Sequence, residues 1–162
     1  MYMNEVYKEL VQKRVLEFNG EPISNGQIEH AAILVVELVR VAKKELNLFV
    51  GNLNSRVYGQ KAFVEEVRTF LGTTGRKVKI ILEAPEEIDV NDHRFVREFA
   101  SNDDVEFFTY TGNAEMAPNY HFVLADGHSY RFEADKKSIS AVAAFNDPKG
   151  AGVLAKRFNT FL

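Results

Sequence analysis

The chain has 162 residues, which is enough for one domain with a sizeable core and short for two. Hydrophobic residues make up 46% and charged residues 27%, a balance typical of packed domains that excludes wholesale disorder. The absence of cysteine excludes disulfides and thiolate zinc sites and favours a cytoplasmic protein.

The net charge of -3 argues against nonspecific nucleic-acid binding, which depends on Lys and Arg neutralising phosphates. Glu5, Lys8 and Glu9 interrupt the N-terminal apolar residues, so we expect no signal peptide, and no apolar run is long enough to span a membrane. Basic clusters are interpreted as solvated helix ends and strand edges, with a nucleic-acid-binding face as the alternative. These clusters are Lys43-Lys44, Arg76-Lys77-Val78-Lys79, Lys136-Lys137 and Lys156-Arg157.

The first half of the chain predicts helices and buried strands in alternation. Residues 1–22 form an extension in which 6–11 fits a helix and 15–18 fits a strand. A strongly amphipathic helix is predicted from Ser24 to Lys44, with Ser24 and Gln27 as a capping box. A buried strand at 46–50 and a helix at 57–71, which Gly72 terminates, follow.

The second half begins with a strand at 78–82, an acidic loop, a short helix near Asp92 and a strand at 105–110. Two short strands at 121–125 and 129–132 then predict an antiparallel hairpin, and a strand at 139–145 precedes a last helix capped by Asp147. We therefore predict an α/β fold: one domain over 1–162 with a mixed, mostly parallel sheet, helices on both faces and a C-terminal helix.

One segment carries the spacing of a known catalytic motif. Asn119-Tyr120-His121, an apolar run and Asp126 match the positions of His-x-Lys-x4-Asp. With the order of elements over 24–162, this segment resembles a single-motif domain of the phospholipase D (PLD) superfamily. The resemblance implies that in active members the histidine forms a phosphohistidine, the lysine binds phosphoryl oxygens, and two copies dimerise so that the second motif supplies the acid.

The chemistry of this motif is altered. Asn119 occupies the histidine position and His121 the lysine position; asparagine cannot form the phosphoryl intermediate, and histidine replaces a lysine cation only in part. A shifted frame makes His121 the nucleophile but places Val123 and His128 at the lysine and aspartate positions. Neither frame is complete.

The downstream sequence supports the same resemblance. The family's Gly-Ser-x-Asn is matched to Ala143-Ala144-Phe145-Asn146, which keeps only the asparagine. The stretches 126–133, 144–148 and 158–161 are similar to small bacterial PLD-like proteins of undefined activity. The chain is accordingly identified as a degenerate single-motif member that uses no cofactor.

Three candidate sites follow from the residues. His121, Asp126, His128 and Arg131 predict a shared polar pocket, whereas the alternative makes His121 a hydrogen-bonded strand residue and Asp126 a turn residue. Asn54, Ser55 and Arg56 follow a strand and precede a helix, so they are candidates for anion binding. The carboxylates from Glu83 to Asp92, with His93, have no recognised metal spacing, so we expect a solvated loop and no metal.

These observations favour a catalytically degenerate PLD-like domain that acts in binding or assembly, as a homodimer or with another protein. The first alternative is a divergent phosphodiesterase or nuclease that uses His121, with Asp126 and Arg131, across a dimer cleft. The second is a non-catalytic nucleic-acid-binding subunit, which we do not favour on charge.

Overall fold

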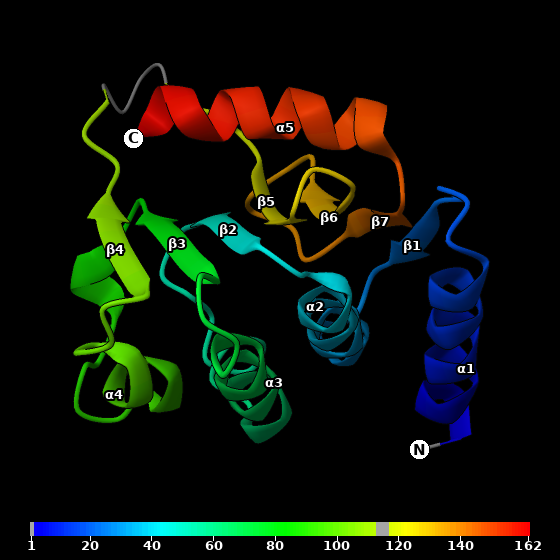
Figure 1. Cartoon of the computed structure of the whole chain (residues 1–162), viewed down its shortest axis with the longest axis horizontal. Coiled ribbons are helices and arrows are strands. Elements are labelled where there is room, and N and C mark those ends of the chain that lie inside the picture. Colours follow the sequence, from blue (N-terminus) through cyan, green and yellow to red (C-terminus); the bar gives the residue numbers. More distant parts are fainter. Residues whose placement is uncertain (1, 113–116) are drawn as a thin grey trace.

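The computed structural model describes residues 2–112 and 117–162 (Figure 1). Its helices are α1 (Tyr2–Glu17), α2 (Ile28–Val41), α3 (Lys61–Leu71), α4 (Arg94–Phe99) and α5 (Pro148–Phe161), with a 3-10 turn at Pro85–Glu87. Its strands are β1 (Ile23–Asn25), β2 (Glu45–Val50), β3 (Lys77–Leu82), β4 (Val105–Thr109), β5 (His121–Ala125), β6 (Ser129–Glu133) and β7 (Ala141–Phe145).

The seven strands form one mixed sheet in the order β1-β7-β6-β5-β2-β3-β4. Only β2–β3 and β3–β4 are parallel pairs in the described part of the chain. The α/β class and the mixed sheet are confirmed, but the expected excess of parallel pairing is wrong. The difference arises because β5, β6 and β7 form a meander and β1 adds antiparallel to its end.

Helices cover both faces of the sheet, as predicted. Helix α5 lies across one face and α1 to α4 lie on the other (Figure 1). Side chains alternate between the faces because successive strand residues point to opposite sides: Leu48 and Val123 pack toward α1–α4, whereas Phe49 and Phe122 pack toward α5. Two apolar cores result, and between them they fix the register of the strands.

In the N-terminal third of the chain, the structure contradicts two predictions made from the sequence. Residues 15–17 continue α1, so the strand expected at 15–18 is wrong, and Phe18 follows with a positive φ of 47°. Ser24 is not a helix cap: it lies in β1 opposite Val142, and α2 begins at Ile28 after Gln27, whose side chain makes no capping bond. The capping-box prediction failed because pairing with β7 holds Ser24 in an extended conformation.

The starts of α3 and α5 can also be compared with the prediction. Helix α3 begins four residues later than predicted, because Val57 and Tyr58 donate to the Asn54 carbonyl in a separate turn. The predicted cap of α5 is confirmed, since Asp147 Oδ1 accepts from the Gly150 N–H at 3.2 Å. None of the helices in the described segments is long and apolar enough to cross a membrane.

Candidate functional site at the carboxyl ends of the parallel strands

His121 lies where β2 and β3 end. Strand β5 runs antiparallel to β2, with Phe122 opposite Phe49, so its first residue sits beside the carboxyl end of β2. Gly51 follows β2, and a Cβ placed there would lie 3.3 Å from His121 Cε1. A larger residue at 51 would therefore crowd the imidazole.

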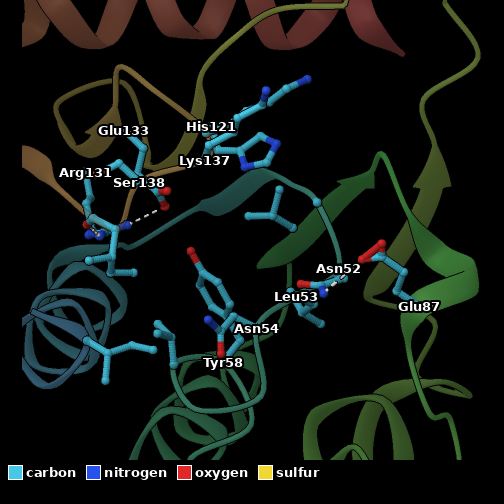
Figure 2. Close-up of a pocket in the computed structure, with 16 residues that line it drawn as sticks. Asn52, Leu53, Asn54, Tyr58, Glu87, His121, Arg131, Glu133, Lys137 and Ser138 are labelled. Atoms are coloured by element: carbon cyan, nitrogen blue, oxygen red, sulfur yellow. Dashed lines mark hydrogen bonds and ion pairs between the residues drawn. The ribbon is translucent and has the colours of Figure 1, made fainter. Parts of the chain in front are cut away.

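A cavity of about 420 Å³ opens at this position, and we call it the carboxyl-end cavity (Figure 2). Two chain segments, 50–58 and 131–139, supply most of its wall, and Ile28, Glu87 and His121 supply the rest. Such a location is where open α/β sheets usually bind ligands, because strand ends and their loops meet there.

An acidic side chain joins two basic ones beside this cavity. Glu83, the residue after β3, places Oε1 2.6 Å from His121 Nε2 and Oε2 3.0 Å from the ammonium of Lys136. The His121 and Glu83 side chains are only 13% and 14% exposed, so the pair is largely shielded from water. His121 and Lys136, which both line the cavity, are thus already bonded to one internal carboxylate.

Arg131 lines the cavity and is almost completely buried. Its guanidinium donates to Asn25 Oδ1 at 3.0 Å, to Glu133 Oε1 at 2.7 Å and to the Ile139 carbonyl at 2.9 Å. Tyr58 directs its hydroxyl toward the Arg131–Glu133 pair (Figure 2), and burial raises the pKa of that hydroxyl well above its usual range. The tyrosine is therefore a neutral hydrogen-bonding group in the cavity.

Asp126 lies at the other end of β5, about 17 Å from His121 at the usual rise of a strand. Its carboxylate accepts the consecutive backbone N–H groups of Lys43, Lys44 and Glu45 at 2.8 to 2.9 Å. Burial alone would raise the pKa of Asp126, but these three donors and the nearby His128 outweigh it and lower that pKa. His121, Asp126, His128 and Arg131 therefore do not line one pocket, and that prediction is wrong.

Asn146 also lies at this second end. It donates from Nδ2 to the Phe18 carbonyl at 2.9 Å, and its N–H bonds to Ser129 Oγ. The shifted frame would place Val123 at the lysine position and His128 at the aspartate position. His128 Nε2 is 3.3 Å from Asp126 Oδ2, and Val123 is buried in the core, so these residues form no site with His121. Asn119 is exposed just before β5, and its carbonyl accepts the Lys136 N–H at 2.8 Å, which keeps it beside the cavity.

The loop after β2 borders two cavities. Asn54 lines both, and its side chain accepts the Arg56 N–H at 3.0 Å. Ser55 lines only the second cavity, whereas Arg56 lines neither and points its guanidinium toward Glu29 at 3.8 Å. Anion binding by this loop stays a prediction.

Comparison of the fold with solved structures identifies its class. The archaeal chromatin protein TrmBL2, whose structure was described as showing a novel mode of DNA binding, superposes with a TM-score of 0.62 and 12% identity, over 99% of this chain and 60% of TrmBL2. NucT from Helicobacter pylori, a PLD-superfamily protein, superposes with a TM-score of 0.60 and 10% identity, over 87% of this chain and 96% of NucT. The chain has a PLD-like fold, as its resemblance to that superfamily implied.

Residues 27–161 match the family described as "Domain of unknown function (DUF7931)". The chain belongs to that family. A search of curated proteins gave no match.

The sequence did not predict that Tyr58, Glu133 and Lys136 line the cavity or that Glu83 lies beside it. Glu83 had one usable signal, since it directly follows a buried strand whose carboxyl end faces the site. Lys136 and Lys137 were treated only as a basic pair, and their position depends on the loop between β6 and β7.

Proposed function

We propose that this chain is a PLD-like domain that keeps the fold without the phosphodiesterase chemistry and binds an anionic group at the carboxyl-end cavity. The contact between Glu83 and both His121 and Lys136 is the observation that carries this proposal. A phosphoryl transfer site places hydrogen-bond donors and cations where charge develops on phosphate, and here one carboxylate already bonds His121 and Lys136. Asn119 adds no nucleophile, because its amide nitrogen is not basic.

Lys137 supports binding of an anion. It lines the cavity and takes part in no ion pair within the described segments, whereas Arg131 and Lys136 are both paired. An anion that enters would bond to Lys137 first and would compete with Glu83 for Lys136. We therefore expect weak binding that strengthens when the Glu83 charge is removed.

The test measures hydrolysis and binding separately. Purified protein without added metal should not hydrolyse bis(p-nitrophenyl) phosphate above the buffer rate, and His121→Ala should behave identically. In a phosphate titration followed by NMR, Glu83→Gln should bind about three- to tenfold more tightly, a gain of about 1 kcal/mol. The matched control is Glu86→Gln, which removes an exposed carboxylate of the same loop.

Turnover that disappears in His121→Ala would establish the alternative, a divergent phosphodiesterase. Phosphate affinity that is identical in Glu83→Gln and in the wild type would refute the binding site. DNA or RNA binding that weakens steeply with salt would favour the nucleic-acid-binding alternative, because such binding releases counterions.

We also propose that two copies associate with their Asn119 residues near the shared seam, as the resemblance to single-motif PLD proteins implies. Because the chain has no cysteine, a single Asn119→Cys variant reports on this arrangement directly. It should form an intermolecular disulfide on mild oxidation, while exposed Asp103→Cys should not. A monomer in analytical ultracentrifugation at micromolar concentration would contradict the proposal.

A further inference from the structure

Tyr58 brings an unused hydrogen-bond donor into the carboxyl-end cavity. The residue is only 4% exposed and lines the cavity from the turn between β2 and α3. Its hydroxyl points toward Arg131 and Glu133 (Figure 2). No described residue accepts the hydroxyl proton, and the guanidinium of Arg131 can only donate. The hydroxyl oxygen keeps accessible surface, so a molecule in the cavity can reach it.

Glu133 brings an unused acceptor to the same place. Its Oε1 accepts from Arg131 at 2.7 Å, whereas its Oε2 accepts from no described residue and also keeps accessible surface. Arg131 and Glu133 both act on the pKa of Tyr58, which agrees with the convergence of the three side chains. Tyr58 and Glu133 therefore offer one donor and one acceptor to a ligand.

A hydroxyl group is the ligand group that matches this pair. Its oxygen can accept from Tyr58 while its proton is donated to Glu133, whereas a phosphate oxygen without a proton can only accept and an ammonium can only donate. The charge of Glu133 also disfavours a second anion at this position. Leu53 and Val57 belong to the same wall and can contact the carbon atoms that carry the hydroxyl.

The pair lies close to the part of the cavity to which the proposed function assigns an anion. Glu133 in β6 is directly opposite His121 in β5, and the side chains of such a pair start about 5 Å apart. Lys137 lines the same cavity. A phosphate near Lys137 and a hydroxyl at Tyr58 and Glu133 can therefore belong to one small molecule, and a cavity of about 420 Å³ has room for it.

We propose that the ligand of the carboxyl-end cavity is an organic phosphate with a hydroxyl group close to its phosphate, as in a phosphorylated sugar. The hydroxyl accepts from Tyr58 and donates to Glu133. This inference rests on the proposed function, because it takes anion binding beside Lys137 as its starting point.

Two probes that differ only in hydroxyl groups test the proposal. They are ribose 5-phosphate and tetrahydrofurfuryl phosphate, which keeps the ring and the phosphate but has no hydroxyl. In titrations followed by NMR, ribose 5-phosphate should bind about tenfold more tightly, because it adds two hydrogen bonds. Tyr58→Phe should reduce this ratio to about threefold and leave the affinity for tetrahydrofurfuryl phosphate unchanged, which also shows that the variant is folded. Tyr110→Phe, which removes a hydroxyl on the α5 side of the sheet, should keep the wild-type ratio.

Equal affinities of the two probes for the wild type would overturn the proposal, and so would a ratio that Tyr58→Phe does not change. After either result the proposed function still stands if inorganic phosphate binds and binds more tightly to Glu83→Gln. If neither probe nor inorganic phosphate binds, the proposed function and this inference are both refuted.

Discussion

Replacing Asp126 should destabilise the fold, because its carboxylate holds two strands together. In the wild type its carboxylate joins the end of β5 to the start of β2 through three backbone N–H groups. Hydrogen bonds to a charged group each contribute about 1.5–3 kcal/mol. Since Lys43, Lys44 and Glu45 are exposed and their amides can bind water instead, the lower end of that range applies.

Asp126→Ala should therefore lower the free energy of unfolding by about 5.5 kcal/mol, about 4.5 kcal/mol from the three hydrogen bonds and about 1 kcal/mol from the strain of alanine at a positive φ. The φ of Asp126 is 53°. Asp126→Asn should cost about 1–2 kcal/mol, because asparagine tolerates this φ and keeps one acceptor oxygen. Urea denaturation at pH 7 measures both values, with Asp103→Asn as a control that should stay within about 0.5 kcal/mol of wild type.

The pH dependence gives the sharper test. The pKa of Asp126 is lowered in the folded state from an ordinary value of 3.8. Its stabilising contribution is therefore fully present above that value and is lost as the pH falls through the lower folded pKa. The difference in stability between wild type and Asp126→Asn should be constant from pH 7 to 5 and shrink below about pH 4. Equal stability at pH 7, or a difference that persists undiminished at pH 3, would refute the reasoning.

Two further predictions concern stability. Gly75→Ala should lower the free energy of unfolding by only the roughly 1–2 kcal/mol of a positive φ, because nothing lies within 4 Å of the added Cβ. Gly20→Ala should lower it clearly more, because its Cβ would lie 2.7 Å from the Asn146 carbonyl oxygen. Equal melting temperatures for the two variants would contradict this. Arg131→Met should cost about 3 kcal/mol, because Glu133, whose side chain is only 13% exposed, loses its cation, and Arg131→Met/Glu133→Leu should recover part of that loss in urea denaturation. A double variant less stable than the single one would contradict the pairing.

Strands were predicted most accurately in segments that are buried, because burial determines their amino-acid composition. The apolar runs at 46–50 and 78–82 predicted buried strands correctly, since parallel strands covered on both faces need apolar side chains on both. Strand β1 escaped prediction because its three residues carry too little pattern. Its pairing with β7, more than 110 residues later, comes from the assembled sheet.

The candidate site was predictable only in part, for a similar reason. His121 was identified from the motif, but Glu83 meets it through the sheet order β5-β2-β3, which no local spacing encodes. The grouping of Asp126 with His121 failed for a simpler cause. The strand that begins at His121 ends just before Asp126, which places the two residues about 17 Å apart, too far for one pocket.

Because His121 and Asp126 lie at opposite ends of β5, the two residues have separate roles in the structure. One end of the strand lines the cavity, and the other anchors the sheet to the turn before β2. Substitution of Asp126 should therefore change mainly stability, whereas substitution of His121 should change the wall of the cavity. Asp126 thus belongs to the architecture of the sheet, and His121 belongs to the cavity.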